Sequence, residues 1–253
     1  MSRAQRIDIA GYYHIVNRGV EQRDVFTNPI DFEKFLNILN TVSLKFNVTL
    51  HAYCLMNNHY HLLIETKDNR LSYFMKLINS QYAIYFNKRY KRVGHLWQGR
   101  FKSWYVTDER YLYTLIKYIE YNPLKAKIIK NLGQYPYSSY QSLIGEAKRL
   151  PCMNNSLMMR DYSFNEAKEF FTLDYNPQEL EEINKSSSLV VSSLKKEEPD
   201  IQSMLFDFNN YETKKERNEL VHDYYKQGYS QHLMAKYLGL AQSSINKILN
   251  KKE

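Results

Sequence analysis

Apolar residues along the first 125 positions alternate between two spacings, which predicts strands interleaved with helices. Four β-rich runs are typical of strands: Gly11–Asn17, Val48–Met56, His59–Thr66 and Phe101–Val106. Two longer segments carry apolar residues at helical spacing: Ile30–Lys45 and Leu71–Tyr90. A last helix is expected to be capped by Thr107 or Asp108 and to end near Tyr121, because Pro123 restrains the residue before it.

The order of these elements is strand, helix, strand, strand, helix, strand, helix. Asn57 and Asn58 separate the second strand from the third, and asparagine tolerates the backbone conformation of a tight hairpin. The pattern predicts an α+β fold of ferredoxin-like type, an antiparallel sheet with helices on one face.

A second helical pattern occupies the end of the chain. It predicts three short helices: Lys214–Lys226, Gln231–Leu238 and Gln242–Leu249. Ala235, Gly239 and Ile245 have the spacing of a helix-turn-helix, and the segment resembles that superfamily. In its usual docking the last helix enters the major groove, where four side chains would face DNA: Gln242, Ser243, Asn246 and Lys247. The alternative is a small three-helix packing or dimerisation module.

Charge divides the chain into three parts. The 253 residues carry 35 Lys and Arg against 27 Asp and Glu, a net charge of +8. Residues 1–149 have a net charge of +11, residues 150–212 of −7 and residues 213–253 of +4. We interpret 1–149 as the main domain, 150–212 as an acidic linker with short helices, and 213–253 as the helix-turn-helix domain. A basic, tyrosine-rich protein favours nucleic acid as its partner.

Composition excludes several other classes. Hydrophobic residues make up 43% of the chain, enough for a folded core. The two cysteines, Cys54 and Cys152, exclude a disulfide scaffold and fit a reducing cytoplasm. No run approaches the ~18 apolar residues of a membrane span, and the first residues have no signal-peptide pattern. We therefore expect a cytoplasmic protein without a membrane partner.

Two histidines stand two residues apart on a predicted strand. His59 and His61 share one face of that strand, and Tyr60 points to the other. Neighbouring imidazoles make half of a site for a divalent metal. The pair alone also fits a structural role.

One helix places a tyrosine beside an asparagine. Tyr118 and Asn122 are four residues apart, at the edge of the buried stripe of the helix that ends near Tyr121. The tyrosine hydroxyl can reach a cleft from there, and the asparagine oxygen can bind a cation. Equally, a tyrosine at a core boundary and an asparagine before proline are ordinary structural features.

A basic and aromatic stretch lies between residues 88 and 105. Its cations suit phosphate contacts, and its aromatic rings can stack on unpaired bases, which favours single-stranded nucleic acid. The candidate contacts are Lys88, Arg89, Lys91, Arg92, Trp97, Gln98 and Arg100. The alternative is a solvated loop whose aromatic residues belong to the core.

Three blocks together resemble a known family. MNNHYHLLIET, HLWQGRFKSW and YIEYNPLKA, within residues 8–145, are similar to the single-tyrosine HUH transposases, above all the IS200-like class and its relatives associated with repetitive extragenic palindromes. The resemblance implies that His59, His61 and Asn122 are ligands of Mg²⁺ or Mn²⁺. It implies that Tyr118 is the nucleophile, forming a 5′-phosphotyrosine and leaving a free 3′-OH.

The resemblance implies a DNA transposase, a site-specific nickase and ligase that acts on single-stranded DNA with a hairpin. The +4 segment would add a contact with duplex DNA. An alternative is a domesticated regulator that binds nucleic acid on the same fold without cutting it. The sequence does not decide between a monomer and a homodimer.

Overall fold

The strands pair into one antiparallel sheet. The computed structural model of the chain describes residues 8–106, 111–172, 201–227, 229 and 231–250. Within these ranges the strands follow the order β2-β3-β1-β4, and every pairing is antiparallel. They are β1 (Gly11–Arg18), β2 (Thr49–Met56), β3 (His59–Thr66) and β4 (Lys102–Tyr105).

Helices connect and extend these strands. Those of the described ranges are η1 (Val20–Gln22), α1 (Pro29–Phe46), α2 (Leu71–Arg89), α3 (Leu112–Glu120), α4 (Asn122–Lys125), α5 (Tyr140–Leu143), η3 (Pro151–Met153), α6 (Leu157–Asp161), α7 (Phe164–Thr172), α9 (Ile201–Asn210), α10 (Lys214–Lys226), α11 (Gln231–Leu238) and α12 (Gln242–Asn250). One helix follows β1 and another follows β3, so the predicted ferredoxin-like α+β fold is confirmed.

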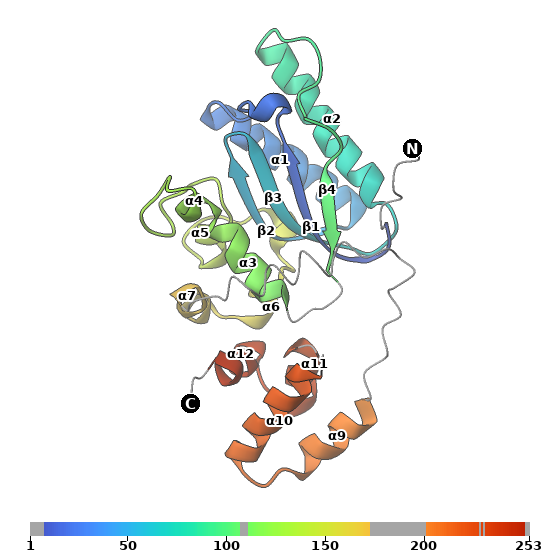
Figure 1. The fold of residues 1–253 in the computed structure, drawn as a ribbon, viewed down its shortest axis with the longest axis vertical. Coiled ribbons are helices and arrows are strands. Elements are labelled where there is room, and N and C mark those ends of the chain that lie inside the picture. Colours follow the sequence, from blue (N-terminus) through green and yellow to red (C-terminus); the bar gives the residue numbers. More distant parts are fainter. Residues whose placement is uncertain (1–7, 107–110, 173–200, 228, 230, 251–253) are drawn as a thin grey trace.

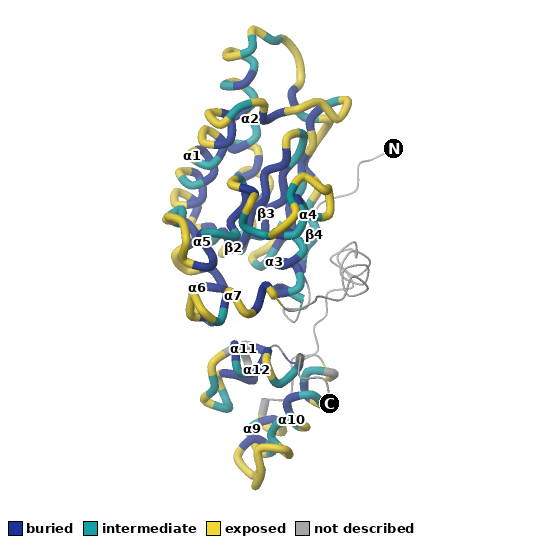
Figure 2. Tube along the Cα trace, turned by 90° about the vertical axis from the view of Figure 1, so that its left-hand side faces the viewer, coloured by how far each residue is buried: buried dark blue, intermediate teal, exposed yellow. Residues whose placement is uncertain are grey.

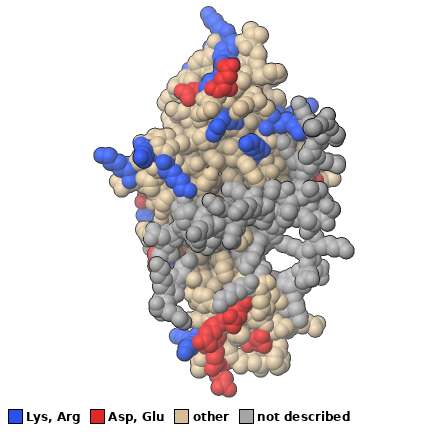
Figure 3. All heavy atoms as spheres, viewed as in Figure 1, with Lys and Arg blue, Asp and Glu red and all other residues tan. Residues whose placement is uncertain are grey.

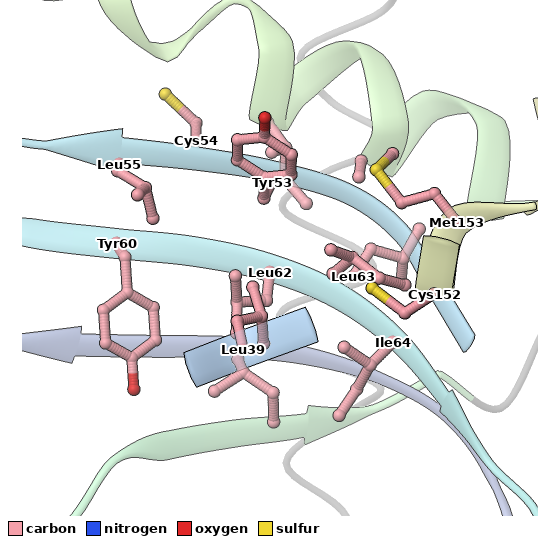
Figure 4. Packing of buried hydrophobic residues seen from close by; sticks show 14 of the residues in the cluster. Leu39, Tyr53, Cys54, Leu55, Tyr60, Leu62, Leu63, Ile64, Cys152 and Met153 are labelled. Carbon is pink, nitrogen blue, oxygen red and sulfur yellow. The ribbon is translucent and has the colours of Figure 1, made fainter. Parts of the chain in front are cut away.

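Helices α1 and α2 cover one face of the sheet (Figure 1). Asn28 caps the first turn of α1 by accepting backbone N–H groups, as a helix start requires. The ring of Phe35 on α1 then lies 4.9 Å from that of Tyr60 on β3. Leu39 of α1 and Leu62 of β3 lie on this same side of the strands (Figure 4).

Helix α3 lies on the opposite face. The ring of Tyr118 on α3 is 5.8 Å from that of His61, the strand neighbour of Tyr60. Because neighbouring residues of a strand point to opposite faces, α1 and α3 lie on opposite sides of the sheet, so helices cover both faces and not only the one face that the sequence predicted. The stripe expected to anchor this helix is buried, namely Leu112, Leu115, Ile116 and Ile119. The expected capping residues, Thr107 and Asp108, lie outside the described residues.

The body continues past residue 149, where the sequence suggested a linker. Cys152 and Met153 of η3 lie against the sheet beside Leu63 (Figure 4), and Phe170 and Phe171 of α7 are buried in the same core. In the described part next to the body, Asp161, Glu166 and Glu169 lie on α6 and α7, whose apolar residues pack inward. Net charge alone did not reveal that packing. Residues 173–200 of the expected linker lie outside the described residues.

The last helices have a core of their own. Met204 and Phe208 of α9 pack with Val221 of α10 and Ile245 of α12. Helices α10, α11 and α12 occur at the predicted positions, and Gly239 between the last two has a φ of 62°. Figure 2 shows this C-terminal unit below the body, with buried residues on its helices.

Charged residues gather unevenly on the face viewed in Figure 1. Figure 3 shows Lys and Arg at several places on the body, including the side where α4 lies, and Asp and Glu both near the upper end of the body and near the end of the C-terminal unit. Across the described ranges, no helix combines the length and the apolar character needed to cross a membrane.

Candidate active site and nucleic-acid surface

The predicted histidine pair lies at the start of β3. The rings of His59 and His61 are 5.1 Å apart between centroids, on the face of the sheet that α3 covers. His61 is only 6% exposed, whereas His59 is half-buried. The Nδ1 atom of His59 lies 2.5 Å from Oδ1 of Asn58. An asparagine oxygen can only accept, so Nδ1 of His59 carries the proton and Nε2 keeps its lone pair.

A third histidine, which the sequence analysis did not single out, joins this pair. Nε2 of His14 on β1 is 3.0 Å from Nδ1 of His61. The two rings stack at 5.3 Å between centroids. On the other neighbouring strand, β4, the ring of Trp104 stacks on that of His14, also at 5.3 Å between centroids. Both contacts follow from strand pairing, because His14 lies directly opposite Trp104 and diagonally across from His61.

Helix α3 brings Tyr118 to the histidines. Its ring lies 5.8 Å from that of His61 and 5.9 Å from that of His14, with both pairs edge to face. Asn122, at the start of α4, donates its side-chain Nδ2–H to the backbone oxygen of Tyr118 at 2.8 Å. That hydrogen bond fixes the amide group and leaves the oxygen Oδ1 outside it. The predicted tyrosine and histidine pair therefore meet on one face of the sheet, and Asn122 binds the backbone of that tyrosine.

Burial keeps these histidines neutral. Removal from water lowers the pKa of His14 to about 3 and, together with the charge of Arg18, lowers the pKa of His59 to about 4. The pKa of His61 is also lowered, by burial first and then by the neighbouring histidines. At neutral pH all three rings are therefore uncharged and each keeps one nitrogen lone pair.

A cation lies over the ring of the tyrosine. Nζ of Lys125, in the last turn of α4, is 4.5 Å from the centroid of the Tyr118 ring. Partial burial lowers the pKa of this lysine. A cation here would attract a negatively charged group that approaches Tyr118.

Among the described residues, no three His, Cys, Asp or Glu side chains form a metal-binding cluster. A metal on the predicted ligands would therefore be held by two imidazole nitrogens and one amide oxygen.

The basic stretch divides into two groups. Lys88, Arg89 and Lys91 are exposed at the end of α2 that projects beyond the sheet, and Arg92 is half-buried. Arg89 also lies 3.6 Å from the buried carboxylate of Asp31. No described contact joins this group to the histidines.

The second group, Trp97, Gln98 and Arg100, lies closer to them. The backbone N–H of Gln98 donates to the oxygen of Arg18, which pairs with His59 in the sheet. The indole N–H of Trp97 donates to the backbone oxygen of Asn79 on α2. Trp97 is thus partly a packing residue, and its remaining surface faces a cavity.

That cavity lies between α2 and the segment of residues 94–101. Its volume is about 890 Å³, and its wall includes Asn79 and Ala83 of α2 together with Trp97. Lys76 and Arg100 also line it, and no acidic residue of the described chain does. Its walls combine apolar surface with positive charge.

The predicted groove-facing residues of α12 lie against the body. Ser243 is 1% exposed and donates to Glu166 of α7 at 2.8 Å, while Asn246 is 7% exposed. Nζ of Lys247 is 3.1 Å from a carboxylate oxygen of Glu169. Duplex DNA would reach these side chains only after α12 separates from α7. The side chain of Gln242 lies outside the described residues.

His14 and Lys125 were missed for different reasons. His14 follows two tyrosines in an apolar strand and becomes notable only when the pairing of β1 with β3 is known. Lys125 is one of several lysines after Pro123. Only the path of the chain after α3 shows that this one contacts the ring of Tyr118. Its position seven residues after the tyrosine, two helical turns away, was the available signal.

Known proteins that are similar to this chain include three transposases. A protein of Haemophilus influenzae named as a REP-associated tyrosine transposase is 30% identical over 101 residues, which is 35% of this chain. The match spans 57% of that relative's length. A solved structure of a REP-associated tyrosine transposase bound to a REP hairpin has a TM-score of 0.48 and 20% identity, covering 57% of this chain and 86% of the other. A solved transposase from Deinococcus radiodurans has a TM-score of 0.34 and 19% identity, covering 47% and 96%.

The family comparison covers the region built above. The model of the family described as "Transposase IS200 like" matches residues 9–122, from the start of β1 to Asn122. This range contains the whole sheet, both histidines of β3, Tyr118 and Asn122. Residues 9–122 of this chain are therefore similar to the IS200-like transposase family over the sheet and the candidate site.

Proposed function

We propose that this protein is a transposase, a metal-dependent endonuclease and strand transferase for single-stranded DNA that acts through a covalent phosphotyrosine. One observation carries the proposal: β3 and α3 bring His59, His61 and Tyr118 together on one face of the sheet. The similarity of residues 9–122 to the IS200-like transposase family supports the same activity.

The donor set fits a divalent metal. His59 uses Nδ1 to bind Asn58, and His61 has Nδ1 next to His14, so both point Nε2 away from these partners. Asn122 uses Nδ2 to bind the helix and retains Oδ1. The amide oxygen suits Mg²⁺ and Mn²⁺, imidazole nitrogens are common ligands of transition metals, and none of the three ligands carries a charge. The bound metal would polarise the scissile phosphate and offset negative charge in the transition state.

Tyr118 supplies the nucleophile. Its phenol oxygen forms a bond to phosphorus, and the bond from phosphorus to the 3′ oxygen breaks. The phenol loses its proton, and the departing oxygen gains one to become a free 3′-OH. The 5′ end stays on the tyrosine, so a 3′-OH can reverse the step and rejoin strands. Lys125, 4.5 Å from the ring, would stabilise the phosphate in both directions.

The substrate is single-stranded DNA next to a hairpin, as the resemblance implies. The cavity beside Trp97 would receive an unpaired base, with Lys76 and Arg100 on the neighbouring phosphates. The C-terminal unit would add duplex binding through α12. Because the contacts are ionic, affinity should fall steeply with salt.

The decisive test compares Tyr118→Phe with wild type on a labelled single-stranded oligonucleotide that contains a hairpin, in the presence of Mn²⁺. Wild type should form a covalent adduct that survives denaturation, and Tyr118→Phe should form none. Tyr121→Phe is the matched control, because the Tyr121 hydroxyl donates to the backbone oxygen of Phe171 and serves packing. This control should form the adduct.

Two outcomes would contradict the mechanism. One is that wild type forms no adduct, and the other is that Tyr118→Phe forms as much adduct as wild type. DNA binding without cleavage, if it also survives EDTA and the loss of His59, His61 and Tyr118, would favour the non-cutting regulator instead.

A further inference from the structure

We propose that His14 is a positioning residue: its Nε2 accepts the Nδ1–H of His61 and thereby holds the His61 ring in the tautomer that can bind the metal. The inference rests on the proposed function. It concerns a residue of β1 that neither the sequence motifs nor the comparisons assign to the site.

The two histidine rings meet through one pair of nitrogen atoms. Nε2 of His14 and Nδ1 of His61 are 3.0 Å apart, a normal hydrogen-bond length, and both rings are almost fully buried. Trp104 stacks on His14, and Tyr118 meets it edge to face. Three adjacent strands therefore each contribute one ring to a row across the sheet, and His14 occupies the middle.

A single proton lies between the two nitrogens. If His14 donated it, Nδ1 of His61 would be the acceptor and the ring proton of His61 would be on Nε2, where it would block a metal. If His61 donates it, Nε2 of His61 keeps its lone pair. Only the second arrangement makes His61 a ligand. An outer partner that fixes the tautomer in this way is the usual companion of a metal-binding histidine.

His14 itself is not placed as a ligand. Its Nε2 faces His61, and it forms no cluster with three or more metal-binding side chains in the described ranges. A purely structural role would require only a ring of similar shape beneath Trp104. The positioning role requires an acceptor at the place of Nε2, so the two roles predict different results for variants of similar size.

The experiment uses the full chain and two variants. His14→Gln places an amide oxygen near the position of Nε2, and His14→Leu removes the acceptor while keeping comparable volume. Circular dichroism checks that both fold. Proteins labelled with ¹⁵N-histidine and freed of metal report the tautomer by NMR, with the His61 signals identified through their loss in His61→Asn. Calorimetry with Mn²⁺ measures metal affinity.

In wild type and His14→Gln, Nδ1 of His61 should carry the proton and Nε2 should be unprotonated. His14→Leu should lose this preference and bind Mn²⁺ about 10- to 100-fold more weakly, while His14→Gln stays within about threefold of wild type. A wild-type proton on Nε2 would overturn the inference. So would equal Mn²⁺ affinities in wild type and His14→Leu, or equal losses in both variants.

Failure of the proposed function looks different. If wild type binds no Mn²⁺, the metal site is refuted, and the tautomer measurement still decides what His14 does. If wild type binds Mn²⁺ and forms the tyrosine adduct while His14→Leu does the same, the function stands and the role of His14 falls.

Discussion

Glu120 gives the body a stability that should depend on pH in one predictable direction. The residue lies on α3 between Tyr118 and Asn122 and is 1% exposed. Burial raises the pKa of this carboxyl from the usual 4.5 to about 8, although Ser139 donates a hydrogen bond to it. One of its oxygens has no hydrogen-bond partner. In the folded protein the group is therefore mostly protonated at neutral pH.

The sign and size of this pH dependence follow from the linkage between proton binding and folding. Because the folded pKa is the higher one, the folded state holds the proton over the interval between 4.5 and about 8, while the unfolded chain releases it. Stability is therefore lost as pH rises through this interval, by about 1.4 kcal/mol per pH unit. Over the whole interval the loss attributable to Glu120 is about 5 kcal/mol, and it levels off above pH 8.

Glu120→Gln removes the titration and keeps the shape. Urea unfolding of wild type and variant, measured in EDTA from pH 5 to pH 9, should give stabilities whose difference grows in favour of the variant up to about pH 8. Trp97 and Trp104 both lie in the body, so their fluorescence reports its unfolding. The test is how the stability difference between variant and wild type changes with pH. A constant effect of the new amide on stability does not alter that change. Parallel pH profiles would refute a raised pKa at Glu120.

Three further outcomes follow from the site and its surroundings. Lys125→Met should slow formation of the tyrosine adduct by about 100-fold in single-turnover assays, whereas Lys125→Arg should keep most of the wild-type rate. A Lys125→Met rate equal to that of wild type would show that the charge is dispensable. Ala83→Phe fills the cavity and should weaken single-stranded DNA binding about tenfold by anisotropy, whereas Ile84→Phe, on the same helix but outside the cavity wall, should not. Glu169→Gln removes the ion pair with Lys247 and should raise duplex affinity about twofold; an unchanged affinity would argue against docking through α12.

Sequence predicts the strands well because turn residues and the alternation of side chains are local features of the chain. The strand at His59–Thr66 is bounded by Asn57-Asn58, and its alternation alone places His59 and His61 on one face. The adjacency of Tyr118 and Asn122 likewise follows from helix geometry, and their hydrogen bond agrees with it. What these patterns cannot state is which strand or helix lies beside which residue.

Apart from Lys125, the features that sequence reasoning missed depend on long-range packing. His14 acquires its partner 47 positions away through the pairing of β1 with β3. The apolar residues of η3 and α7 find the body core despite an acidic segment around them. Ser243 and Asn246 have the polarity of groove-facing residues, yet both are buried in the folded chain. Polarity predicts a tendency toward solvent, and tertiary contacts decide whether it is realised.

The charges around Tyr118 favour a phosphodiester before any metal is counted. The three histidines are neutral because burial lowers each pKa, and Glu120 is protonated at neutral pH because burial raises its pKa. Lys125 stands over the ring. The same desolvation therefore removes negative charge from the carboxyl and preserves lone pairs on the imidazoles. A divalent cation held by uncharged ligands would then direct its whole charge to the phosphate, which is where an attacking phenol needs it.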